Sequence, residues 1–295
     1  MRRVPWIRSR FRLAAGLLAA LLVALPAAAS GARRVVCLGG DVTEIAFALG
    51  AQAQIVCDDQ TSLYPAAAAA LPQVGYLRTL SAEGVLACRP DLIIASADAG
   101  PAAAMTQLAA SGVPLAHISN AHSPDAVALK IAQVAQALGE EARGRALASR
   151  YAAALAAARA RVAAYADHPR ALFLMAQGTG GAMAAGRDTA ADAMLRLAGA
   201  RNVASGFTGY KLLTPEAALA LQPDVIVIAD FALKLLGGPE ALRARPEIAA
   251  TPAGRTGRIV PMDTLLLLGF GPRTPEALSA LAVALHGGSA AVAGR

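Results

Sequence analysis

Residues 81–94, SAEGVLACRPDLII, are similar in sequence to residues 214–227, TPEAALALQPDVIV. Each stretch begins with a hydroxyl residue that can cap a helix, has a glutamate two residues later and continues as a short apolar helix. Each then passes through Pro-Asp into a run of large aliphatic residues typical of a buried strand. Because Gly-Tyr precedes both stretches, at 75–76 and 209–210, we interpret them as two copies of one α/β unit.

Strands alternate with helices on both sides of these copies. In the first half of the chain, strands are predicted at 34–38, 54–57, 91–96 and 113–118. In the second half, strands are predicted at 171–175, 225–229 and 258–262, with helices at 189–198 and 275–286. Asp41 is predicted to cap a further helix over 42–49. This alternation predicts an α/β fold of two Rossmann-like lobes built on parallel strands.

An alanine-rich stretch, residues 123–166, lies between the two series and is broken at Gly139. Its second part predicts one long linking helix that spans about 40 Å. We therefore divide the chain into an N-terminal α/β lobe at 30–139, a linking helix at 140–168 and a C-terminal α/β lobe at 169–295. Two similar lobes joined in this way leave a cleft, and clefts between domains commonly bind ligands.

The N-terminus, residues 1–29, is interpreted as a secretory signal peptide. Five arginines precede an apolar run at 13–25 and the small residues 27–29, which form a cleavage site. No cysteine lies at that site, so we expect a periplasmic protein without a lipid anchor. Removing the five arginines lowers the formal net charge from +7 to about +2 (7 − 5), which gives no reason to expect nucleic-acid binding.

Three cysteines, Cys37, Cys57 and Cys88, remain after cleavage, and an odd number leaves at least one free thiol. Cys37 and Cys57 lie in apolar runs and are expected to be small buried core residues. The chain has no GxSxG, GxxxxGK[ST] or HExxH motif, so an enzyme is not expected. His117 and His122 lack a third ligand at metal-binding spacing.

Tyr76 and Arg78 form the pattern most informative about a ligand. In an extended segment the two side chains point to the same side. A neighbouring positive charge stabilises a phenolate, which is a hard oxygen donor suited to ferric iron, and tyrosine is one of the axial ligands of haem. From spacing alone, a surface tyrosine near an arginine is the simpler interpretation, and the spacing does not by itself indicate a haem ligand.

The chain resembles the periplasmic haem-binding proteins of bacterial ABC haem importers. The resemblance extends in order over nearly all of the mature chain, through residues 38–45, 71–78, 80–86, 182–186, 189–192, 206–208 and 267–271. It implies the class III periplasmic binding protein fold, with two α/β lobes, one rigid linking helix and a shallow cleft. It implies that the protein is a monomer and that the ligand it transports is ferric haem b. It also implies that its partners are an inner-membrane permease and its ATPase.

The resemblance also implies roles for individual residues. Tyr76 is expected to be the axial iron ligand, with Arg78 beside its oxygen or the haem propionates. Some family members add a histidine from the other lobe, but Gln177 stands there in this chain, so one protein ligand is expected. Tyr210, the counterpart of Tyr76, is expected to stack on the porphyrin, hydrogen-bond to it, or pack as an ordinary loop residue.

Glu83 and Glu216 hold matching places in the two copies. Either could simply favour the positive end of a helix dipole. The resemblance implies that they dock on arginines of the two permease subunits. The sequence also allows other interpretations of the function: the same fold binding a corrinoid or a ferric siderophore, an exported enzyme, or a haem scavenger without a transporter.

Overall fold

The computed structural model describes residues 33–176 and 181–287, and the first half of this part forms a four-stranded parallel sheet. Its strands are β1 (Val35–Leu38), β2 (Ile55–Asp58), β3 (Leu92–Ser96) and β4 (Leu115–Ile118). They lie in the order β2-β1-β3-β4, so β1 is an inner strand of the sheet. β1 and β3 are buried along their whole length, which is why they are aliphatic without alternation.

The second half forms a six-stranded mixed sheet. It contains β5 (Arg170–Met175), β6 (Met183–Ala185), β7 (Arg201–Asn202), β8 (Tyr210–Leu212), β9 (Val225–Ala229) and β10 (Ile259–Met262). β10, β9 and β5 are parallel, as predicted, and β6 and β8 add antiparallel strands. β6 and β8 were not predicted, because three residues are too few to show a pattern.

Helices cover both sheets. In the first lobe they are α1 (Gly40–Ala48), α2 (Ala66–Ala69), α3 (Ala82–Ala87) and α4 (Ala102–Ala110). In the second they are α7 (Ala190–Leu197), α8 (Pro215–Leu221), α9 (Asp230–Leu235), α10 (Gly238–Ala244), α11 (Pro246–Ala249), α12 (Pro252–Thr256), α13 (Thr264–Leu268) and α14 (Thr274–His286). Among the helices of residues 33–176 and 181–287, none is both long and apolar enough to cross a membrane.

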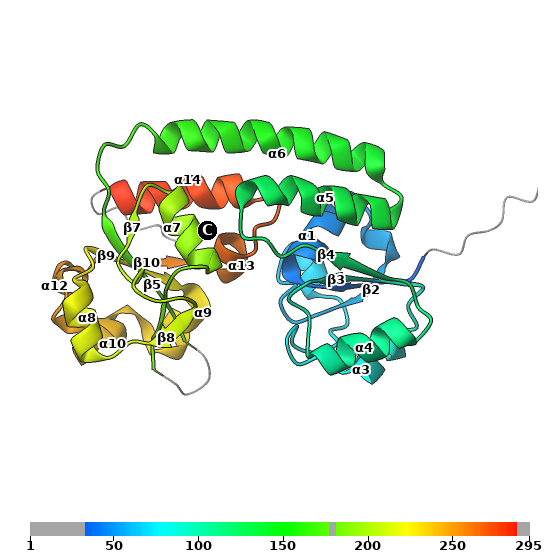
Figure 1. The fold of residues 1–295 in the computed structure, drawn as a ribbon, viewed down its shortest axis with the longest axis horizontal. Coiled ribbons are helices and arrows are strands. Elements are labelled where there is room, and N and C mark those ends of the chain that lie inside the picture. Colours follow the sequence, from blue (N-terminus) through cyan, green and yellow to red (C-terminus); the bar gives the residue numbers. More distant parts are fainter. Residues whose placement is uncertain (1–32, 177–180, 288–295) are drawn as a thin grey trace, which may run out of the picture. The chain divides into compact units, whose positions relative to one another are not determined.

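Two further helices, α5 (Pro124–Leu138) and α6 (Glu141–Val162), connect the lobes. The break between them is at Gly139, whose φ of 73° is the left-handed conformation that glycine adopts easily. α6 has 22 residues and packs on both α5 and α14 (Figure 1). Leu147, Tyr151 and Leu155 form its buried stripe, and the Tyr151 hydroxyl donates to the Pro124 carbonyl at 2.8 Å. α6 is therefore held against elements of both lobes.

The predicted duplication appears as matching elements in the two lobes. α3 leads into β3, and α8 leads into β9. Ser81 Oγ accepts a hydrogen bond from the Gly84 amide at 3.3 Å, and Thr214 Oγ1 accepts one from the Ala217 amide at 3.2 Å. Both hydroxyl residues therefore cap their helices, as the sequence predicted.

The three cysteines are divided between a disulfide and a buried thiol. Cys57 of β2 is bonded to Cys88, at the end of α3, across 31 residues of sequence. Cys37 of β1 is free and buried. The prediction of at least one free thiol is confirmed, and Cys57 is buried as expected, but its bond to Cys88 was not foreseen.

Replacing both bonded cysteines, Cys57→Ser with Cys88→Ser, is expected to lower the free energy of unfolding by about 3 kcal/mol, because the unfolded chain is no longer constrained by a closed loop. Urea denaturation measures this loss. Alkylation under denaturing conditions is the control: the unreduced wild-type protein should take up one alkyl group, at Cys37, and the reduced protein three. Three groups without reduction would mean that the disulfide does not form.

Candidate functional site

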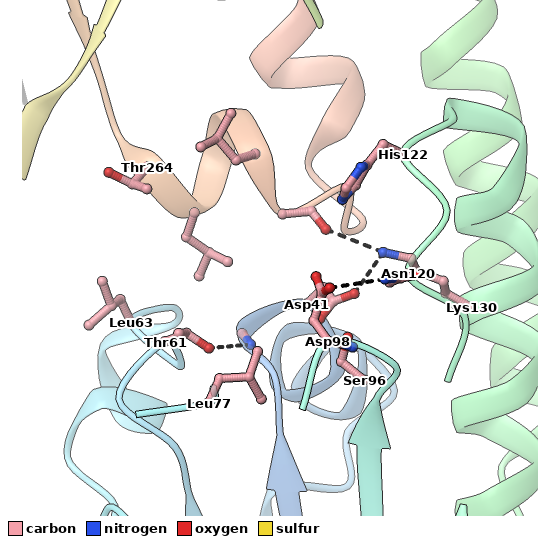
Figure 2. Close-up of a pocket in the computed structure, with 14 residues that line it drawn as sticks. Asp41, Thr61, Leu63, Leu77, Ser96, Asp98, Asn120, His122, Lys130 and Thr264 are labelled. Atoms are coloured by element: carbon pink, nitrogen blue, oxygen red, sulfur yellow. Dashed lines mark hydrogen bonds and ion pairs between the residues drawn. The ribbon is translucent and has the colours of Figure 1, made fainter. Parts of the chain in front are cut away.

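A pocket of about 190 Å³ lies between the two lobes. Figure 2 shows polar residues of the first lobe on one side of it, among them Asp41, Asp98 and His122, and Thr264 of α13 on the other. Leu63, Leu77, Leu265 and Leu268 give the pocket an apolar part. A polar floor with apolar walls is suited to a ligand that is mostly hydrophobic and carries a few polar groups.

The loop that follows β2 forms one edge of the pocket and is fixed by Asp59. This buried carboxylate accepts hydrogen bonds from the amides of Gly39, at 2.7 Å, and Thr61, at 2.9 Å. The Gly40 amide in turn donates to Thr61 Oγ1 at 2.9 Å (Figure 2). A methyl group at Gly40 would collide with the Thr61 carbonyl and with Leu265 of the other lobe, so this close approach requires glycine.

Lys130 and Asp41 form a buried ion pair in the pocket floor. Lys130 of α5 is 1% exposed and Asp41 of α1 is 8% exposed, and Lys130 Nζ lies 2.7 Å from Asp41 Oδ2 (Figure 2). The ammonium group also donates to the Gly269 carbonyl of the second lobe at 3.4 Å. The prediction that Asp41 caps a helix is wrong, because α1 starts at Gly40, with Gly39 as its N-cap residue. Asp41 instead neutralises a buried lysine.

A second polar group surrounds Asp98. Its carboxylate accepts a hydrogen bond from Asn120 Nδ2 at 3.0 Å and pairs with Arg78 Nη2 at 3.3 Å. His122 lies near this group, and burial lowers the pKa of His122, so that its ring is neutral at pH 7. Within residues 33–176 and 181–287, no cluster of three or more His, Cys, Asp or Glu side chains is suited to a metal ion.

Tyr76 and Arg78 flank Leu77, which lines the pocket. The Tyr76 side chain is 37% exposed, and Arg78 is turned toward Asp98. Tyr210 of β8 is half-buried, and burial raises its pKa, while the Arg78 charge and a hydrogen bond with Thr189 lower it. Arg78 therefore acts electrostatically on a tyrosine of the other lobe. Gln177 lies outside the described residues.

Glu83 and Glu216 are exposed in the first turns of α3 and α8. The backbone amide of Glu216 and the Thr214 hydroxyl lower the pKa of the Glu216 carboxyl group. This side chain is therefore ionised at neutral pH and held close to its own helix. The two glutamates occupy equivalent places in their lobes, as the sequence comparison of the two copies predicted.

Residues 35–264 match the family model described as periplasmic binding protein. The chain belongs to this family. The match covers both lobes and the helices that connect them. The prediction of a two-lobed α/β binding-protein fold is confirmed.

Several relatives of this binding protein have solved structures or curated names. The apo form of the periplasmic heme-binding protein RhuT from Roseiflexus sp. RS-1 is 44% identical, with a TM-score of 0.84, over 87% of this chain and 98% of that chain. The periplasmic heme-binding protein BhuT, in complex with two hemes, is 48% identical, with a TM-score of 0.82 and the same coverage. The vitamin B12-binding protein of Yersinia pestis (strain Pestoides F) is 38% identical over 125 residues, 42% of this chain and 43% of that protein.

The binding protein also has a buried ion pair that joins its lobes. Arg273, before α14, donates from Nη2 to Glu44 Oε2 of α1 at 3.0 Å and from its backbone amide to Glu44 Oε1 at 3.2 Å. The guanidinium group stacks on the Tyr64 ring at 3.5 Å. Burial raises the pKa of Glu44, and the Arg273 contacts oppose that rise. The pair therefore gives the buried Glu44 carboxyl group a guanidinium group and a backbone amide as partners.

Arg273→Met is expected to lower the free energy of unfolding by about 3 kcal/mol at pH 7, because it leaves the Glu44 carboxylate buried without its cation. The folded-state pKa of Glu44, already raised, rises further in the variant. The additional loss is therefore present at neutral pH and disappears as the pH falls below about 4, where Glu44 is protonated in both states.

Chemical denaturation at several pH values measures this effect. Arg159→Met is the matched control, because Arg159 pairs with Asp125 on the exposed surface and should cost less than about 1 kcal/mol. Equal losses for the two variants at pH 7 would contradict a special role for the buried pair.

Proposed function

We propose that this protein is a periplasmic carrier that binds ferric haem b between its lobes and delivers it to an inner-membrane ABC importer. The observation that carries the proposal is the pocket that both lobes line, in which Leu77, the residue between Tyr76 and Arg78, forms part of the wall. The similarity to RhuT and BhuT, which are named heme-binding proteins, supports haem as the cargo. The carrier reaches the periplasm through the signal peptide at 1–29, without a lipid anchor, and acts as a monomer.

In this proposal Tyr76 is the protein ligand of the iron. Its phenolate oxygen is a suitable ligand for a ferric ion. The Arg78 side chain is 58% exposed, so it can exchange Asp98 for the phenolate or for a haem propionate. Leu63, Leu265 and Leu268 cover the porphyrin, and each Å² of apolar surface removed from water contributes about 25 cal/mol.

Tyr210 and Gln177 have supporting roles in the proposal. Because burial raises the pKa of Tyr210, it is a neutral phenol at pH 7, suited to contact the porphyrin or donate a hydrogen bond to it. Gln177, which stands where some family members have a histidine, is not expected to ligate the iron. BhuT holds two hemes, so the stoichiometry of binding to this chain is a further quantity that haemin titration measures.

Tyr76→Phe removes only the proposed ligand oxygen. We expect it to weaken haemin binding at least tenfold, about 1.4 kcal/mol, and to abolish the charge-transfer absorption of tyrosinate-ligated ferric haem. Absorption titration measures both effects. Tyr165→Phe is the control, because Tyr165 stacks on His286 of α14 and has no proposed role in haem binding. An unchanged spectrum and affinity for Tyr76→Phe would remove Tyr76 from the site, whereas no haemin binding by the wild-type protein would remove haem as the cargo.

A corrinoid is the second candidate cargo, favoured by the local similarity to the vitamin B12-binding protein. Competition between cyanocobalamin and haemin for the purified protein distinguishes the two. A ferric siderophore is tested in the same way. Steady turnover of any of these compounds would favour an exported enzyme over a carrier.

Docking on the permease is proposed to use Glu83 and Glu216. Both carboxylates are exposed at the starts of capped helices, where they can meet arginines of the two permease subunits. Ion pairs of this kind set the register and association rate of a complex. One glutamate per lobe allows one protein to contact both subunits.

The double variant Glu83→Lys/Glu216→Lys is expected to bind haemin with unchanged affinity and to lose stimulation of the importer ATPase, because like charges then meet across the interface. ATP hydrolysis by the importer in lipid nanodiscs measures docking. Glu141→Lys, an exposed substitution on α6, is the control. Full stimulation by the double variant would mean that docking does not use these glutamates, whereas no stimulation by the wild-type protein would favour a haem scavenger without a transporter.

A further inference from the structure

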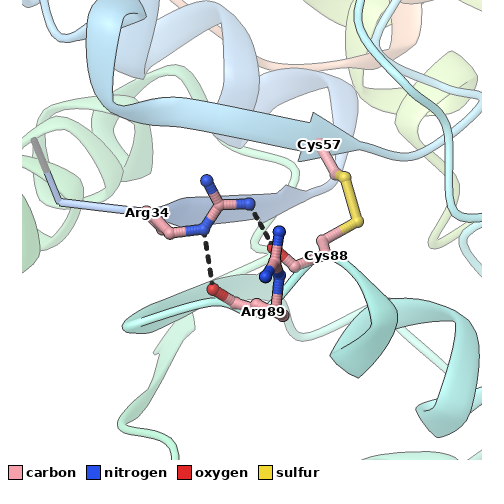
Figure 3. Close-up of a disulfide and its surroundings, with 4 residues drawn as sticks. All are labelled: Arg34, Cys57, Cys88 and Arg89. Atoms are coloured by element: carbon pink, nitrogen blue, oxygen red, sulfur yellow. Dashed lines mark hydrogen bonds between the residues drawn. A yellow bond between two sulfur atoms is a disulfide. The ribbon is translucent and has the colours of Figure 1, made fainter.

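The C-terminal end of α3 is held by an arginine that precedes β1. Arg34 donates from Nη2 to the Cys88 carbonyl at 2.7 Å and from Nε to the Arg89 carbonyl at 2.9 Å (Figure 3). Its backbone amide donates to Asp91 Oδ2 at 2.9 Å, and its carbonyl accepts from the Asp91 amide at 2.8 Å. The carbonyls of Cys88 and Arg89, the two residues that follow α3, are therefore bound by a guanidinium group that is fixed to the first strand of the sheet.

The second lobe repeats this arrangement with different residues. Arg170, the first residue of β5, donates from Nη2 to the Leu221 carbonyl at 2.7 Å and from Nε to the Gln222 carbonyl at 3.1 Å. Its backbone amide donates to Asp224 Oδ2 at 3.1 Å, and its carbonyl accepts from the Asp224 amide at 2.8 Å. We call each such arrangement an arginine clamp.

An arginine is well suited to this position. Its planar guanidinium group presents several donors in a fixed geometry, so it can hold two successive carbonyls at once. Its positive charge also interacts favourably with the negative end of the helix dipole. Because Ser81 and Thr214 cap the other ends, each helix is bound at both termini. The direction of Glu83 or Glu216 is then determined by the sheet of its own lobe.

The two lobes differ in one respect. Cys88, whose carbonyl receives the Arg34 hydrogen bond, is also bonded through its sulfur to Cys57 of β2 (Figure 3). Leu221 holds the corresponding place in the second lobe and has no such bond. The end of α3 is therefore attached to its sheet by a clamp and a covalent bond, and the end of α8 by a clamp.

We propose that Arg34 and Arg170 are positioning residues that orient the docking carboxylates. Docking depends more strongly on Arg170, because in the first lobe the disulfide holds the same helix end as Arg34. The inference rests on the proposed docking function of Glu83 and Glu216. Neither arginine contacts the pocket between the lobes, so loss of a clamp should affect the importer and leave cargo binding unchanged.

The test compares Arg170→Ala and Arg34→Ala in the full-length protein loaded with haemin. The readout is the concentration of loaded protein that half-saturates ATP hydrolysis by the importer in nanodiscs. We expect Arg170→Ala to raise this concentration about tenfold and Arg34→Ala less than about twofold, with the maximal rate and the haemin affinity within about twofold of wild type. Arg150→Ala, an exposed charge removal on α6, is the control and should have no effect.

The disulfide provides a second comparison. Cys57→Ser/Cys88→Ser alone should have little effect on half-saturation, because the clamp at Arg34 remains. Adding Arg34→Ala to that double variant should raise the half-saturating concentration about tenfold, a non-additive result expected only when two constraints act on one helix end. Additive effects of the three substitutions would overturn the proposed redundancy.

Arg170→Lys retains the charge but lacks the fixed, planar set of donors that holds two successive carbonyls, so it should have an intermediate half-saturating concentration even if Arg170→Ala fails to fold. Hydrogen exchange of the α8 amides should increase in the same order. Unchanged half-saturation for Arg170→Lys and Arg170→Ala, or a fall in haemin affinity that parallels the docking defect, would overturn the assignment.

If the wild-type protein docks without haemin binding, the cargo proposal fails and the clamps are tested with unloaded protein. If the glutamate reversal has no effect, the exchange data decide whether the clamps hold the helices.

Discussion

Glu44 of the first lobe and Arg273 of the second form an ion pair in which little of either side chain is exposed to water. Glu44 is 5% exposed, and a carboxylate at such a depth is stable only with a close cation. Moving the lobes apart at this point would break both hydrogen bonds between Arg273 and Glu44. α6 adds a second constraint, because it packs along both α5 and α14. The pocket between the lobes is consequently formed before any ligand arrives, and binding need not supply the energy to assemble it.

The parts of the fold that were predictable from the sequence are those determined by local pattern and by burial on both faces. β3 and β9 each have five buried residues in succession, so the large aliphatic residues that follow Pro-Asp do not alternate with charged ones. The helix caps at Ser81 and Thr214 depend on neighbours three residues away and were visible for the same reason. The two-lobed organisation followed from the repetition of these local units.

Features that depend on distant partners were not predictable in the same way. Asp41 and Lys130 are 89 residues apart, and an aspartate at the start of a helix has the same local pattern whether it caps the helix or neutralises a buried lysine. The pairing of Cys57 with Cys88 depends on α3 ending beside β2, and β8 is too short for its three residues to indicate a strand. For the candidate site, the sequence singled out Tyr76 and Arg78, but the polar floor made by Asp98, Asn120 and His122 required the structure.

Duplication of the lobes did not produce two equal sites. Gly75-Tyr76 and Gly209-Tyr210 occupy matching positions, and both glycines have positive φ values, 110° and 77°. Tyr76 is 37% exposed and lies two residues before Arg78 in the sequence, whereas Tyr210 is packed into its lobe near Thr189, where burial favours the neutral phenol. Burial makes Tyr210 the less suitable of the two tyrosines for ligating an iron ion as a phenolate. The proposed ligand and the disulfide-bonded docking helix thus belong to one lobe, and the second lobe supplies the surface that completes the pocket.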